Sequence, residues 1–163
     1  HKQIRKMVNN AIQLTSDALI DVRNSVFALR QEKGEITPLE ERIKGIIDSI
    51  PKETMVNFKC IGSFNKISPQ VDLTIYRAAQ EMVNNVIKHS EAKEIEIILD
   101  STDDSIIRLS CSDDGKGSES YKNGFGIIGL EERVKLLRGD LSIESSKGNG
   151  FKISIRIPKD HDD

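Results

Sequence analysis

The segment from residue 151 to 157 places the strongest constraint on the fold of this chain. Phe151, Ile153, Ile155 and Ile157 alternate there with Lys152, Ser154 and Arg156. Strict alternation predicts a β-strand with one buried face and one face in water. The buried face of such a sheet needs a second layer against it. We therefore expect a two-layer domain whose sheet is covered on one face.

Further segments along the chain supply the rest of these two layers. Strands are predicted at 54–60, 94–99, 105–111 and 141–144, and helices at 39–50, 68–89 and 126–137. Ser68 and Pro69 have the pattern of a helix N-cap followed by proline in the first turn. Residues 147–150 predict a hairpin before the last strand. The fold class is α+β, a two-layer sandwich of a mixed sheet with helices on one face.

A long amphipathic segment precedes this domain. One wide stripe of apolar and small residues follows helical spacing over residues 2–30 and contains Ile4, Val8, Ala11, Thr15, Ala18, Val22, Ser25 and Leu29, with Ile12, Leu19 and Val26 beside it. A stripe of this width is typical of a helix in a four-helix bundle. We favour a bundle or dimer over a helix packed on its own domain. The polar segment 31–38 suggests domains at 1–33 and 34–159, with an acidic tail at 160–163.

Composition excludes several classes of function. The net charge is −2, aromatic residues make up 4% and there is no Trp, so neither bulk charge nor stacking surfaces favour a nucleic-acid partner. No apolar run approaches the roughly 20 residues of a membrane span, and no signal peptide opens the chain. Cys60 and Cys111 are expected to be buried free thiols without metal-binding spacing. A cytoplasmic location follows for this part of the protein.

The predicted helix 68–89 carries a first candidate site. Glu81, Asn85 and Lys88 are spaced i, i+4, i+7, so they share one helix face, and His89 lies next to it. A carboxylate, an amide and an ammonium together suit the binding of Mg²⁺ and phosphate. On its own, the more common interpretation of such a face is a solvated helix surface.

Three glycine-containing loops follow. Asp113 to Gly117 reads DDGKG and, taken alone, is typical of an acidic turn between strands. Residues 124–129 read GFGIIG and open a helix, where backbone N–H groups can approach phosphate. The dinucleotide-binding interpretation of that pattern fails because a polar loop precedes it, and not a strand. Residues 148–150 read GNG, which a plain hairpin turn explains equally well.

The order of these four motifs over residues 68–157 resembles the GHKL family of ATPases, which use ATP and Mg²⁺. Within that family, the run 80–89 (QEMVNNVIKH) is similar to the N box of sensor histidine kinases that pair with NarL-type response regulators. The run 126–133 (GIIGLEER) is similar to their second glycine box. Residues 18–30 resemble the second helix of their dimerisation domain.

The resemblance implies a role for each matched residue. Glu81 would be the catalytic carboxylate near the γ-phosphate, Asn85 would bind Mg²⁺, and Asp113 would accept a hydrogen bond from the adenine amino group. Residues 116–125 would form a lid over ATP. The implied nucleotide-binding set is Asn85, Lys88, His89, Asp113, Gly115, Gly117, Gly124, Gly126, Ile127, Gly129 and Gly150.

The chain departs from the family pattern at three positions. Asp114 replaces a more usual Asn, which should be tolerated because the resemblance assigns recognition of adenine to Asp113. Phe125 replaces a common His, which puts a lid contact in doubt. Phe151 replaces a common Thr, so a supporting hydroxyl is missing.

The resemblance also raises an expectation about the phosphoacceptor. His1, His89 and His161 are the histidines of the sequence, and none has the family's His-acid pattern at the start of a helix. We expect a fragment of a longer, membrane-anchored parent that forms a homodimer through the N-terminal helix. Two alternatives stay open: a serine kinase of the anti-sigma type, and a non-catalytic ATP-sensing module.

Overall fold

The structure is a computed structural model that describes residues 3–8, 10–12, 14–15, 18–19, 22, 26, 37–118 and 125–159. The chain divides into two compact units, residues 1–37 and 38–163. Every described residue from Gln3 to Val26 is helical, as predicted for these positions. Their apolar side chains, Ile4, Met7, Val8, Ile12, Leu14, Leu19, Val22 and Val26, are exposed. The predicted boundary at 33/34 and the tail at 160–163 lie outside the described residues and stay predictions.

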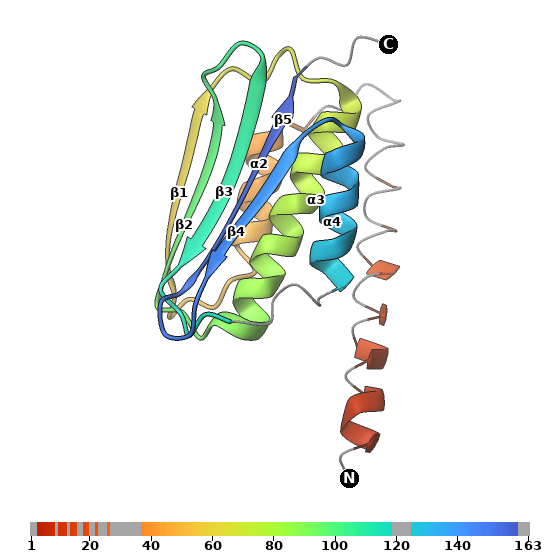
Figure 1. The fold of residues 1–163 in the computed structure, drawn as a ribbon, viewed down its shortest axis with the longest axis vertical. Helices are drawn as coiled ribbons and strands as arrows, with labels where there is room; N and C mark the ends of the chain where they lie inside the picture. The colour runs from red at the N-terminus through yellow and green to blue at the C-terminus, as the bar shows by residue number, and fades with distance from the viewer. Residues whose placement is uncertain are drawn as a thin grey trace. The chain divides into compact units, whose positions relative to one another are not determined.

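The second unit is built on a five-stranded sheet (Figure 1). Its strands are β1 (Met55–Gly62), β2 (Glu94–Ser101), β3 (Ile106–Asp113), β4 (Asp140–Ser145) and β5 (Phe151–Pro158), in the order β1-β2-β3-β5-β4. β1 and β2 run parallel, whereas the other neighbours are antiparallel. The sheet is therefore mixed, as predicted.

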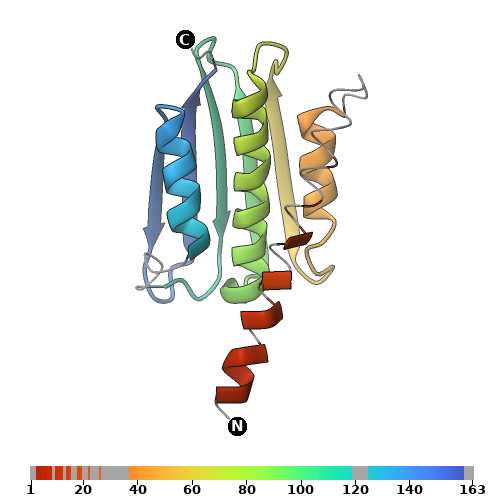
Figure 2. The same ribbon diagram turned by 90° about the vertical axis from the view of Figure 1, so that its right-hand side faces the viewer.

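Three helices cover one face of the sheet, as Figure 2 shows. They are α2 (Leu39–Ile47), α3 (Pro69–Asn85) and α4 (Phe125–Leu136). The Ser68 side chain accepts the Val71 N–H at 3.3 Å and caps α3, so the predicted N-cap is confirmed. An ion pair of 2.5 Å between Arg42 and Asp72 joins α2 to α3.

The core lies between these two layers. Ile153, Ile155 and Ile157 of β5 are each at most 1% exposed, which confirms the predicted alternation. The apolar face of α3 is also buried, and it consists of Val71, Ile75, Ala78, Ala79 and Met82, followed by Val86 in the next turn of the chain. Cys111 is buried and Cys60 is half-buried, and both are free thiols. Burial raises the pKa of Cys111 to about 12 and that of Cys60 to about 11.

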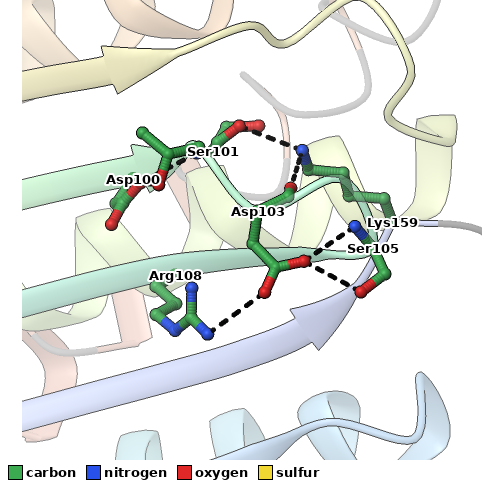
Figure 3. Close-up of polar contacts among 7 residues, drawn as sticks. Asp100, Ser101, Asp103, Ser105, Arg108 and Lys159 are labelled. Carbon is green, nitrogen blue, oxygen red and sulfur yellow. Dashed lines mark hydrogen bonds and ion pairs between the residues drawn. The ribbon is translucent and has the colours of Figure 1, made fainter.

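A buried lysine closes one end of the sheet (Figure 3). Lys159, directly after β5, is 4% exposed, and its ammonium group donates to the carbonyls of Ser101, at 3.0 Å, and Asp103. The Asp103 carboxylate in turn accepts the Ser105 N–H at 2.9 Å. Because Asp113 pairs with Phe151 seven residues before Pro158, this end lies roughly 23 Å from Asp113.

Candidate functional site

The end of α3 differs from the regular helix that the sequence predicts. Glu81 and Asn85 lie half-buried in α3, so their i, i+4 spacing holds. The next turn, η1 (Val86–Ser90), is a π-helix in which Lys88 and His89 are exposed. The α-helical spacing predicted for Lys88 is therefore wrong. Ser90 turns inward, and its hydroxyl donates to the Val86 carbonyl at 2.9 Å.

The first turn of α4 lies against Glu81. A Cβ atom at Gly126 would overlap the Glu81 carboxylate, so a larger residue at this position would require the Glu81 side chain to move. The structure therefore brings together the helix motif and the glycine motif, which are more than 40 residues apart in sequence. The second glycine of the GFGIIG run therefore leaves room for the Glu81 carboxylate in its present position.

The other residues of the glycine motif divide into different roles. Gly129 has open space where a Cβ would be, so packing among the described residues does not require glycine there. The Ile127 side chain is buried in the core, which leaves its main chain for any ligand contact. Gly124 lies outside the described residues, as do lid residues 119–123 and the side chain of Phe125.

Asp113 ends β3 at the start of the DDGKG loop. Its Oδ1 accepts the Gly115 N–H at 2.8 Å. A Cβ at Gly115 would overlap the Ser90 carbonyl group. Gly117 and Gly150 have φ angles of +64° and +73°, and a Cβ on either would overlap main-chain oxygens. These glycines let the loop pack closely between η1 and the β4–β5 hairpin.

Main-chain hydrogen bonds fix this loop on both sides. The Lys116 N–H donates to the Ser90 carbonyl at 2.8 Å, which ties the loop to η1. The Gly148 N–H donates to the Lys116 carbonyl at 2.7 Å, and the Gly150 N–H donates to the Gly115 carbonyl at 3.0 Å. The residues that begin the predicted lid are therefore held in place.

The two neighbouring carboxylates of the loop differ in their electrostatics. Burial raises the pKa of the half-buried Asp113 above the usual value, against the opposing effect of the Gly115 N–H. The Asp114 carboxylate accepts the N–H groups of Glu94, at 2.9 Å, and Lys93, at 2.8 Å, which lower its pKa. An Asn side chain could accept both bonds through its oxygen, which explains why Asp can replace Asn at this position.

Lys88 and Lys116 place positive charge near His89. Although His89 is largely exposed, partial desolvation of its imidazole is the main cause that lowers its pKa, and the charges of Lys88 and then Lys116 lower the pKa further. The imidazole is therefore neutral at pH 7 and available as a hydrogen-bond donor or acceptor. Sequence reasoning missed Glu91, whose carboxylate forms an ion pair of 2.7 Å with Lys116.

An open depression of about 410 Å³ lies at this end of the sheet. Asp113 and Phe151 line it together with Ser112, Glu144, Ser145, Ser146, Asn149 and Lys152. This volume lies within the range of small-ligand sites, which is roughly 300–1,000 Å³. Asp113 is thus one of the residues that line this depression, and the other lining residues come from β3, β4, β5 and the β4–β5 hairpin.

The donor set fits a nucleotide with a weakly held divalent cation. In the described part of the chain, no cluster of three or more His, Cys, Asp or Glu side chains could hold a metal by itself. Mg²⁺ commonly takes one or two protein oxygens and completes its shell with phosphate and water. The Asn85 amide and the Glu81 carboxylate, one helical turn apart, suit that arrangement. No helix among the described residues is long and apolar enough to cross a membrane.

Comparison with known proteins agrees with this geometry. Residues 70–161 match the family model of the histidine kinase-, DNA gyrase B-, and HSP90-like ATPases. The chain is 39% identical over 111 residues to the signal transduction histidine-protein kinase/phosphatase DegS of Bacillus subtilis, covering 63% of this chain and 29% of that protein. It is 30% identical over 161 residues to the sensor histidine kinase ComP of Bacillus subtilis, covering 95% of this chain and 20% of that protein.

A solved structure shares the fold. The histidine kinase domain of the blue-light activated histidine kinase of Erythrobacter litoralis superposes with a TM-score of 0.63 at 19% identity, covering 74% of this chain and 59% of that one. The chain spans less than half the length of the curated relatives described above.

Proposed function

This chain belongs to the histidine kinase-, DNA gyrase B-, and HSP90-like ATPase family, and on that premise we propose that it is the ATP-binding catalytic part of a sensor histidine kinase. The observation that carries the proposal is the contact of Gly126 with the Glu81 carboxylate. It brings α3, whose end would contact the phosphates, next to α4, which follows the proposed lid. The names of the relatives as a histidine-protein kinase/phosphatase and a sensor histidine kinase support the same conclusion.

Each site residue has a task in this proposal. Asp113 holds the adenine amino group, and Gly115, Gly117 and Gly150 keep the loop around it compact. Bound Mg-ATP supplies the γ-phosphoryl group, whose transfer depends mainly on positioning and electrostatics.

At the phosphate end, Asn85 holds the cation through its amide oxygen, and Lys88 and His89 contact phosphate oxygens. Main-chain N–H groups of the segment from Gly124 to Gly129 also meet phosphate. Glu81, which lies beside Gly126, polarises the group that attacks the γ-phosphate.

The proposed partners follow from the first unit and from the relatives. The exposed apolar side chains of the N-terminal helix would be covered by a second copy, so the parent protein is a homodimer. Its phosphoryl group would pass to a histidine and then to an aspartate of a NarL-type response regulator. We further propose that the parent is anchored in the cell membrane and that this part lies in the cytoplasm.

Two assays test the proposal. The chain should bind Mg-ATP, yet it should stay unlabelled with γ-labelled ATP because His1, His89 and His161 lack the expected pattern. A parent protein with an upstream His-acid helix should become labelled and pass the label to its regulator. Acid-labile phosphate on the present chain, or absence of ATP binding, would contradict the proposal.

A further inference from the structure

The ion pair between Glu91 and Lys116 lies at the boundary of the proposed nucleotide site. It joins the end of η1 to the loop that begins the lid, with 2.7 Å between Glu91 Oε1 and Lys116 Nζ. The two side chains are 78% and 57% exposed. Glu91 follows His89 by two residues, and Lys116 lies between Gly115 and Gly117. Both partners therefore adjoin residues proposed to bind nucleotide.

The main chain around the pair is held without it. The Lys116 N–H and carbonyl groups are both hydrogen-bonded, to Ser90 and to Gly148. Glu91 has a φ angle of 52°, a left-handed conformation that is uncommon for a residue other than glycine. This conformation ends η1 and directs the chain into the segment that leads to β2. The side chains can therefore exchange partners while the backbone stays fixed.

An exposed ion pair of this kind adds little to stability. Surface pairs typically contribute about 0–1 kcal/mol because water screens the charges and ordering the long side chains costs entropy. A phosphate group can therefore compete with Glu91 for the ammonium group. The effect of the Lys116 and Lys88 charges on the pKa of His89 supports a common positive region.

We propose that Lys116 is a nucleotide-binding residue that Glu91 holds in the absence of nucleotide and releases to a phosphate group of ATP. The inference rests on the proposed ATP-binding function. Binding then breaks one ion pair and forms another, so Glu91 sets the ATP affinity by competition.

Calorimetric titration with ATP, at fixed Mg²⁺ and low salt, of Lys116→Gln, Glu91→Gln and the double variant tests this competition. Glu91→Gln should tighten ATP binding about 2- to 5-fold, the range that an exposed ion pair supports. Lys116→Gln should weaken binding by a similar or larger factor. In the Lys116→Gln background, Glu91→Gln should have no further effect, because Glu91 acts only through Lys116.

Two results would overturn the inference. One is an unchanged ATP affinity in Lys116→Gln. The other is a Glu91→Gln effect on ATP affinity that is equally large in the wild type and in Lys116→Gln, because Glu91 would then act through its charge alone and not through Lys116. The Lys59–Glu96 pair of the sheet, at 2.8 Å and likewise exposed, provides the matched control, and its Gln variants should bind ATP like the wild type. If the wild-type protein fails to bind ATP, the proposed function itself is wrong. If the wild-type protein binds ATP but the Lys116 and Glu91 variants show neither expected change in affinity, only this inference is wrong.

Discussion

Replacement of Asp113 by Asn separates recognition of adenine from simple packing. Asp113 Oδ1 accepts the Gly115 N–H at 2.8 Å, and an Asn oxygen can keep that bond. The second carboxylate oxygen becomes an NH₂ group, which would face the adenine amino group donor to donor. The loop should therefore stay folded while the ligand loses its acceptor.

The magnitude follows from the charge of the acceptor. A hydrogen bond to a charged group contributes about 1.5–3 kcal/mol, which corresponds to roughly a 10- to 150-fold loss of ATP affinity in Asp113→Asn. Calorimetric titration with ATP at fixed Mg²⁺ measures the loss, and thermal unfolding checks the fold. Asp114→Asn is the matched control, because its oxygen can still accept the Lys93 and Glu94 N–H groups. A folded Asp113→Asn variant that binds ATP within about twofold of wild type would refute the assignment of adenine to Asp113.

The raised pKa of Asp113 adds a pH dependence with a definite sign. Because burial raises this pKa, the carboxylate becomes protonated at a higher pH than an ordinary aspartate as the solution is acidified. ATP binding should then weaken at a higher pH than the usual aspartate range would give. The same titration of Asp113→Asn corrects for protonation of ATP itself, and parallel curves for the two proteins would contradict the prediction.

Three further predictions concern packing and reactivity. Gly126→Ala should slow ATP-dependent phosphotransfer in the parent protein, because the new Cβ would force the Glu81 carboxylate to move, while helix propensity changes by only about 1 kcal/mol. Unchanged transfer would contradict this prediction. Lys159→Met should lower the free energy of unfolding by roughly 2–4 kcal/mol, because it leaves two carbonyl groups without their hydrogen-bond donor, whereas ATP affinity should stay unchanged. Denaturant unfolding measures the stability and calorimetry measures the affinity. An unchanged free energy of unfolding would contradict this prediction. Cys60 and Cys111 should resist thiol reagents in native protein at pH 8, because burial raises the pKa of each thiol; rapid native labelling would contradict this.

Much of the two-layer fold could be predicted because its signals are local. The alternation in β5 and the apolar face of α3 each depend on a period that single residues reveal. The Ser68–Pro69 cap is likewise a local signal. Element ends were less predictable: the predicted helix 39–50 ends at Ile47, after which the Ser49 and Ile50 N–H groups donate to carbonyls three residues back and tighten the turn.

Other features depend on contacts that no local pattern reveals. The π-helical turn at η1 has an ordinary helical sequence, and it departs from the α-helix where Ser90 packs against Gly115. The burial of Lys159 depends on two carbonyls near residue 102, more than 50 residues away. The left-handed Glu91 and its pair with Lys116 were missed for the same reason, because nothing near Glu91 in the sequence marks it.

The central claim is most directly tested by a crystal structure of the chain with Mg²⁺ and a non-hydrolysable ATP analogue. The account predicts that the adenine amino group lies within hydrogen-bonding distance of the Asp113 carboxylate. It also predicts Mg²⁺ on the Asn85 amide oxygen, with Glu81 beside the γ-phosphate. A nucleotide bound elsewhere, or bound here with its adenine away from Asp113, would contradict the account.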